Sequence, residues 1–137
     1  MRVRSIVVFM FLCLVLCLLH AENLQISLAN SSWTNAAGSI LNIETVDEVN
    51  GKLSGYYINK EESFPCRNIP YPLTGFIYED CITFSVIWKS DTESCDALTT
   101  WIGKIEGNEI STSWQLVNHE MTDITNLMSG KDNFRKN

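Results

Sequence analysis

The chain has 137 residues, a length that fits one domain. Acidic residues outnumber basic ones by 16 to 10, and the net charge is −6. An acidic chain without a lysine or arginine cluster argues against nucleic acids and anionic membrane surfaces as partners.

The N-terminus has the pattern of a secretory signal peptide. Arg2 and Arg4 form a basic start, and the segment Ile6–Leu19 is an almost unbroken apolar run. This run is shorter than the roughly 20 residues of a membrane-spanning helix, which disfavours the alternative, a membrane anchor. We therefore predict that residues 1–21 are a signal peptide, that residues 22–137 form the mature domain, and that the protein is secreted.

Removal of the signal leaves an acidic domain with three cysteines. The two lost arginines leave 8 basic residues against 16 acidic ones, a net charge of −8. Cys66, Cys81 and Cys95 remain and enter an oxidising compartment, where disulfides persist. The odd number predicts one bridge and one free thiol, with three possible pairings. The sequon Asn30-Ser31-Ser32 makes Asn30 a candidate glycosylation site.

From Trp33 onward the chain reads as eight short strands separated by turns. Two of the turns, Asn50-Gly51 and Gly107-Asn108, are typical of tight hairpins. Apolar residues show no helical period, and the irregular segment 118–129 has room for one helical turn. The predicted strands in chain order are Trp33–Asn35, Ser39–Glu44, Leu53–Asn59, Leu73–Tyr78, Ile82–Lys89, Leu98–Ile105, Glu109–Leu116 and Lys131–Arg135.

Side-chain character alternates along these strands. Ile82, Phe84, Val86 and Trp88 share one face of their strand, because successive side chains of a strand point to opposite faces. Eight such strands with tight turns predict an all-β fold, namely an eight-stranded antiparallel up-and-down β-barrel.

The face that carries the aromatic residues also carries polar ones. Polar groups buried without partners cost about 1–3 kcal/mol each, so their concentration at one end indicates a site for a small ligand with a polar head. The alternative is that the tryptophans are core and the polar residues are rim. The inward residues are Trp33, Asn35, Tyr57, Asn59, Trp88, Thr99, Trp101, Trp114, Asp132 and Phe134.

Seven segments, in order, resemble the avidin and streptavidin family. They are Trp33–Ser39, Leu53–Tyr57, Pro72–Gly75, Phe84–Trp88, Thr99–Gly103, Trp114–Leu116 and Gly130–Phe134. The resemblance covers residues 32–135 and implies high-affinity, non-covalent binding of biotin, without a cofactor and without catalysis. It also implies sequestration of biotin for defence as the biological purpose.

The resemblance assigns a role to each site residue. The donors to the ureido oxygen of biotin are Asn35, Ser39 and Tyr57. The acceptors from its ureido nitrogens are Asp132 and Asn59, and Thr99 reaches the thioether sulfur. The apolar walls are Trp88, Trp101, Trp114 and Leu116, whereas Trp33 and Phe134 seal the closed end of the barrel.

Two features depart from tetrameric avidins and resemble rhizavidin-like dimeric avidins. Tetrameric avidins lend each site a tryptophan from a neighbouring subunit, and Ile124 holds that position with less apolar area. Dimeric avidins join two mouth loops by a disulfide, which implies the pair Cys66–Cys95 over Cys66–Cys81 or an intermolecular bridge. Ser90 is predicted at the mouth, near the carboxylate of biotin. The resemblance predicts a homodimer, with a homotetramer as the alternative.

The residues disfavour two other classes of function. An enzyme is disfavoured because His119 is the one histidine of the mature chain and has no matching nucleophile nearby in sequence, and the residues show no metal-ligand spacing. A lipocalin-like carrier of another small hydrophobic ligand is the alternative function, but such carriers line their cavities mainly with apolar groups.

Overall fold

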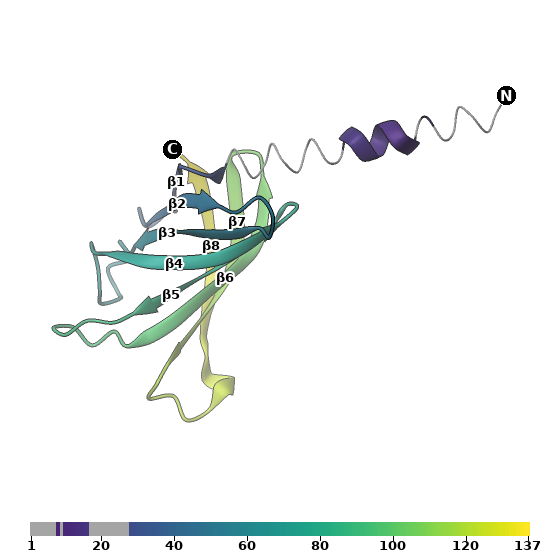
Figure 1. The fold of residues 1–137 in the computed structure, drawn as a ribbon. Coiled ribbons are helices and arrows are strands. Elements are labelled where there is room, and N and C mark those ends of the chain that lie inside the picture. Colours follow the sequence, from purple (N-terminus) through teal and green to yellow (C-terminus); the bar gives the residue numbers. More distant parts are fainter. Residues whose placement is uncertain (1–7, 9, 17–27) are drawn as a thin grey trace.

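The computed structural model describes residue 8, residues 10–16 and residues 28–137 (Figure 1). Residues 10–16 are helical, and among the described residues no helix is long and apolar enough to cross a bilayer. Most of the predicted signal peptide, residues 1–21, lies outside the described residues, so its removal stays a prediction.

Eight antiparallel strands close into one barrel, each strand paired with the next along the chain and β8 paired with β1 (Figure 1). The strands are β1 (Ser31–Thr34), β2 (Ile40–Val46), β3 (Lys52–Ile58), β4 (Pro70–Tyr78), β5 (Cys81–Trp88), β6 (Ala97–Glu106), β7 (Glu109–Asn118) and β8 (Met128–Lys136). This confirms the predicted eight-stranded up-and-down barrel and the existence of all eight strands.

The start of β4 differs from the prediction. The strand begins at Pro70 rather than Leu73, because Pro70 and Pro72 lie in the part of β4 that pairs with β3 alone. A proline lacks the N–H that a central strand needs, but it is tolerated where only one neighbour forms the ladder. The pairing with β5 begins at Leu73.

Alternation along the strands builds the core as predicted. In β5 the side chains of Ile82, Phe84, Val86 and Trp88 are all at most 8% exposed, whereas Ile87 is 69% exposed on the outer face. The same pattern repeats in β7, where the register with β6 keeps inward residues opposite one another. Burial of these side chains stabilises the barrel by about 25 cal/mol per Å² of apolar surface.

Two aromatic residues fill the closed end of the barrel. Trp33 is 1% exposed, and its indole Nε1 donates to Ser31 Oγ at 2.8 Å. Phe134 is completely buried and forms an edge contact with Phe84 at 6.2 Å between ring centroids. Both residues belong to the core, in agreement with the structural role predicted for them.

The long segment between β7 and β8 contains one turn of 3₁₀ helix, Ile124–Asn126, as predicted. Asp123 caps it by accepting a hydrogen bond from the Thr125 backbone N–H at 2.9 Å. The candidate glycosylation residue Asn30 lies just before β1 and is exposed, with a left-handed backbone (φ 56°). Glycosylation of Asn30 stays a prediction.

Candidate functional site

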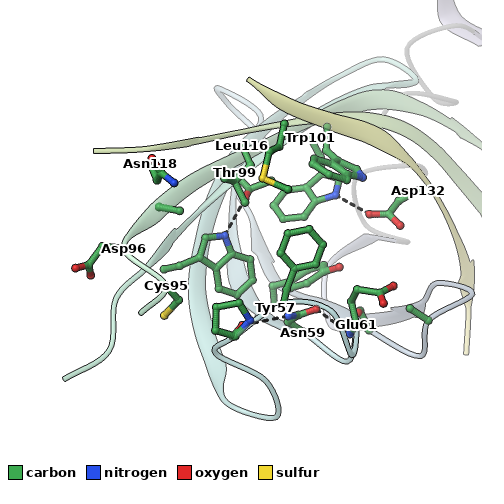
Figure 2. Close-up of a pocket in the computed structure, with 18 of the residues that line it drawn as sticks. Tyr57, Asn59, Glu61, Cys95, Asp96, Thr99, Trp101, Leu116, Asn118 and Asp132 are labelled. Carbon is green, nitrogen blue, oxygen red and sulfur yellow. Dashed lines mark hydrogen bonds between the residues drawn. The ribbon is translucent and has the colours of Figure 1, made fainter. Parts of the chain in front are cut away.

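A cavity of about 620 Å³ opens at the end of the barrel that carries the β3–β4, β5–β6 and β7–β8 connections. This volume lies within the usual range for small-molecule sites, about 300–1,000 Å³. Ten of the twelve predicted ligand-binding residues line it, some of them labelled in Figure 2. They are Asn35, Ser39, Tyr57, Asn59, Trp88, Thr99, Trp101, Trp114, Leu116 and Asp132.

Ser90 and Ile124 do not line the cavity of this chain. The Ser90 hydroxyl accepts hydrogen bonds from the backbone N–H groups of Thr92 and Glu93, both at 3.1 Å, and so shapes the β5–β6 loop. Ile124 lies in the 3₁₀ turn and is 71% exposed. Its predicted role concerned the site of a neighbouring subunit and stays a prediction.

The Asp132 carboxylate organises one end of the cavity. Its Oδ2 accepts a hydrogen bond from Trp101 Nε1 at 2.9 Å (Figure 2), and its Oδ1 accepts one from Asn35 Nδ2 at 2.9 Å. The Asn35 side-chain oxygen in turn accepts from the Ser39 backbone N–H at 2.9 Å. These contacts hold three polar side chains, from β8, β6 and the β1–β2 turn, around one point of the cavity.

The charge state of Asp132 reflects its surroundings. Burial raises the pKa of the Asp132 carboxyl, and the hydrogen bonds from Trp101 and Asn35 oppose this shift by favouring the ionised form. The negative charge of Glu61, which also lines the cavity, raises the pKa further. The Asp132 carboxylate therefore takes up a proton more readily than an exposed carboxylate does.

Tyr57 is a buried hydrogen-bond donor. It is 3% exposed, and its ring lies 4.9 Å from that of Trp101 and 5.9 Å from that of Trp88. Burial raises the pKa of the Tyr57 phenol well above its usual range, the negative charge of Asp132 adds to the shift, and the Ser39 hydroxyl opposes it. The phenol therefore keeps its proton at pH values at which a free tyrosine ionises.

Indole rings wall the rest of the cavity. The Trp88 Nε1 donates to Thr99 Oγ1 at 2.8 Å, which fixes the ring and leaves the Thr99 hydroxyl hydrogen unused. The ring of Trp114 lies against Gly130 of β8, where a Cβ atom would be 2.5 Å from the indole. Gly130 is therefore needed for the observed position of Trp114.

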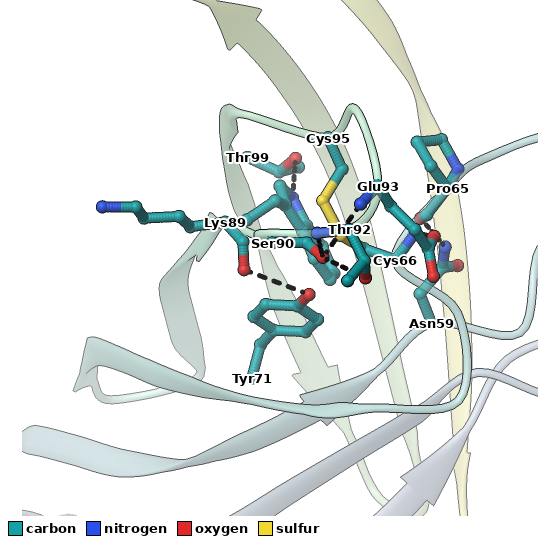
Figure 3. Close-up of a disulfide and its surroundings, with 11 residues drawn as sticks. Asn59, Pro65, Cys66, Tyr71, Lys89, Ser90, Thr92, Glu93, Cys95 and Thr99 are labelled. Carbon is teal, nitrogen blue, oxygen red and sulfur yellow. Dashed lines mark hydrogen bonds between the residues drawn. A yellow bond between two sulfur atoms is a disulfide. The ribbon is translucent and has the colours of Figure 1, made fainter.

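A disulfide joins two loops at the cavity mouth (Figure 3). Cys66 of the β3–β4 loop is bonded to Cys95 of the β5–β6 loop, with 6.1 Å between their Cα atoms. This confirms the predicted pair, and the alternative Cys66–Cys81 is wrong. Cys81 is a free, exposed thiol at the start of β5.

The cavity has further lining residues, from loops and from β6, β7 and β8, that the predicted ligand-binding set did not include. They are Ala37, Glu61, Phe64, Pro65, Ser94, Cys95, Asp96, Ala97, Asn118, His119, Glu120, Met128 and Lys131. Phe64 is the largest of them, and its ring meets Trp114 edge-on with 6.5 Å between centroids. The available signal was the Cys66–Cys95 pair, because a bridge across the mouth places its sequence neighbours there.

The family model of the avidin family matches residues 23–137 of this chain. Afifavidin from Afifella pfennigii is 31% identical over 118 residues, which cover 83% of this chain and 72% of that protein. Hoefavidin from Hoeflea phototrophica is 29% identical over 114 residues, which cover 76% of this chain and 69% of that protein.

Solved structures show the same fold at higher identity. A shwanavidin variant in complex with biotin is 38% identical with a TM-score of 0.74, over 80% of this chain and 96% of that one. The rhizavidin–biotin complex is 38% identical with a TM-score of 0.70, over 80% of this chain and 92% of that one. The family model spans the whole barrel, from β1 to β8, and the solved relatives have the same fold, so the chain belongs to the avidin family.

Proposed function

We propose that this protein binds biotin non-covalently and with high affinity in the cavity at the open end of the barrel. The observation that carries the proposal is the Asp132 carboxylate, held by Asn35 and Trp101 at the end of an indole-walled cavity. The biotin complexes of rhizavidin and of the shwanavidin variant support it, since both structures are similar to this chain.

The polar end of the cavity suits a cyclic urea. Asn35 Nδ2 donates one hydrogen to Asp132 and has a second one for the ligand. The Ser39 hydroxyl oxygen accepts from the Lys60 backbone N–H at 2.9 Å, so its own hydrogen can be donated to the ligand. With the Tyr57 phenol, these donors can converge on the ureido oxygen. Preorganised donors bind well because they need no reorganisation when the ligand arrives.

The ureido nitrogens require acceptors. The Asp132 carboxylate has free lone pairs and accepts from one ureido N–H in a charge-assisted bond. The Asn59 side-chain oxygen accepts from the Glu61 backbone N–H at 3.0 Å and has a second lone pair for the other nitrogen. The Thr99 hydroxyl faces the thioether sulfur, and Trp88, Trp101, Trp114 and Leu116 enclose the apolar part of the ligand.

Binding without turnover, secretion and sequestration of biotin for defence complete the proposal. A lipocalin-like carrier is disfavoured, because hydrogen-bonding groups gather at one end of this cavity. After incubation with the protein, biotin recovered by denaturation should be chemically unchanged in mass spectrometry.

We also propose a homodimer. Phe76 and Ile102 are 54% and 66% exposed and lie in one row across the outer face of β4, β5 and β6, with Thr83 between them. An exposed apolar surface of this kind is suited to pack against a second subunit. Sedimentation of the mature protein should give the mass of two chains; a mass of four chains would replace the dimer by a tetramer.

Titration of the mature protein with biotin tests the main proposal. We expect saturation at one biotin per chain, and the Tyr57→Phe variant should bind about tenfold more weakly because it lacks one donor, a loss of about 1–1.5 kcal/mol. Calorimetry measures both affinities. If the unaltered chain gives neither heat nor thermal stabilisation with biotin, the proposed function is wrong.

The affinity should depend on pH through Asp132. Because the ionised carboxylate accepts from the ligand, binding should weaken as the pH falls through the raised pKa of Asp132, with uptake of a proton when the ligand leaves. Biotinamide is the suitable probe, since it has no carboxyl group of its own. An affinity that is constant down to the pH at which the protein unfolds would contradict the role of Asp132.

The stability of the unliganded protein should depend on pH in the opposite direction: Asp132 should stabilise the fold more at low pH than at high pH. The folded state binds a proton at Asp132 more tightly than the unfolded chain does, because the folded pKa is the higher one. The contribution of this carboxyl is therefore fully present below its ordinary pKa and is lost as the pH rises through the raised value.

A further inference from the structure

Two connections hold the β3–β4 loop to the β5–β6 loop at the cavity mouth (Figure 3). One is the disulfide between Cys66 and Cys95. The other is a hydrogen bond from the Cys66 backbone N–H to the Glu93 carboxylate. Both connections involve Cys66 of the β3–β4 loop, and their partners in the β5–β6 loop, Glu93 and Cys95, are two residues apart.

Glu93 is itself fixed in its loop. Its backbone N–H donates to Ser90 Oγ at 3.1 Å, and its backbone oxygen accepts from the Cys95 N–H at 3.1 Å. The beginning of the loop is anchored where the Tyr71 hydroxyl donates to the Lys89 carbonyl at 3.4 Å. The carboxylate is therefore presented by an ordered turn, which lowers the entropy lost in forming the bond.

The β3–β4 loop needs such support at Cys66. This residue has a left-handed backbone, with φ 58°, a conformation that side chains other than glycine adopt at a cost. Directly before it, Phe64 and Pro65 line the cavity, and the Pro65 carbonyl accepts from Asn59 Nδ2 at 3.4 Å. A shift of Cys66 would thus move cavity walls and a predicted ligand-binding residue together.

We propose that Glu93 is a positioning residue for the biotin site, which holds the β3–β4 loop over the mouth in parallel with the disulfide. The inference rests on the proposed function and extends it. Because the two connections act on the same residue, either one maintains most of the loop position, and the mouth keeps its shape when the disulfide is reduced.

Dissociation of biotin tests this redundancy. With the disulfide intact, the Glu93→Ala variant should release biotin at most about threefold faster than the unaltered protein. In the Cys66→Ser/Cys95→Ser background the same substitution should accelerate release by about tenfold or more, the effect expected of one charge-assisted hydrogen bond. Glu93→Gln, which keeps an oxygen acceptor, should recover most of the loss, whereas Asp91→Ala is the matched control for an exposed carboxylate of the same loop.

Hydrogen exchange at the amide of residue 66 in the unliganded protein provides a second readout, independent of biotin. In the Cys66→Ser/Cys95→Ser background, which lacks the disulfide, Glu93→Ala should accelerate this exchange about tenfold, and Asp91→Ala should leave it unchanged. Equal effects of Glu93→Ala and Asp91→Ala, or of Glu93→Ala in both backgrounds, would overturn the inference. If no variant binds biotin but the exchange responds as expected, the proposed function is wrong, whereas the role of Glu93 in holding the β3–β4 loop is supported.

Discussion

Replacing Asp132 with alanine is expected to weaken biotin binding by about a hundredfold or more. The substitution removes a charged acceptor, and hydrogen bonds to charged groups contribute about 1.5–3 kcal/mol each. It also frees Asn35 and Trp101, whose side chains donate to Asp132 at 2.9 Å. Because Asn35 and Trp101 are then less firmly positioned, the affinity falls by more than the loss of the direct hydrogen bond alone. Calorimetric titration measures the total change in affinity.

Two further variants separate charge from shape at this position. Asp132→Asn keeps the size of the side chain and one oxygen acceptor, so its affinity should lie between those of the unaltered protein and the alanine variant, without the dependence on acidic pH. Asp80→Ala is the control, since Asp80 forms its ion pair with Lys104 away from the cavity lining. An alanine variant at Asp132 that binds biotin as tightly as the Asp80 variant would show that the carboxylate does not contact the ligand.

The predictable part of the site lies on or directly beside strands. Once the alternation in β5 and β7 assigned Trp88 and Trp114 to the interior, the same rule placed Tyr57 and Asp132 there, because side chains on a strand have one of two directions. The barrel closure then brings β3 and β8 to the same cavity. For such residues a local pattern carries information about three-dimensional position.

Loop residues lack that constraint, and most of the differences between the predicted and the observed cavity lining fall among them. Ser90 comes two residues after the end of β5, where no alternation applies, and its hydroxyl turns back to two backbone N–H groups of its own loop. Phe64 and Asp96 line the cavity because a disulfide draws their loops over the mouth. The resemblance to dimeric avidins implied that bridge, whereas the number of cysteines alone left three pairings open.

Replacing Trp101 with alanine is expected to affect both stability and binding. The indole is 4% exposed, stacks on Phe84 with 5.0 Å between centroids and an angle of 12°, and lies 4.9 Å from Tyr57. Truncation of a buried tryptophan lowers the free energy of unfolding by about 3–5 kcal/mol. The same truncation removes a cavity wall and a donor to Asp132, so we expect biotin affinity to fall by about a hundredfold, as at a binding hot spot.

Two tryptophan-to-phenylalanine variants distinguish an effect on binding from an effect on stability. Trp101→Phe keeps an aromatic ring for Phe84 but removes the N–H that favours the ionised form of Asp132, so the pKa of this carboxyl should rise further and binding should weaken most at acidic pH. Trp33→Phe changes a tryptophan that is 1% exposed in the core and does not line the cavity; it should lower the thermal unfolding temperature and leave the affinity unchanged. Since both residues are buried indoles, loss of affinity in both variants would mean that binding follows the stability of the barrel rather than the hydrogen bond from Trp101 to Asp132.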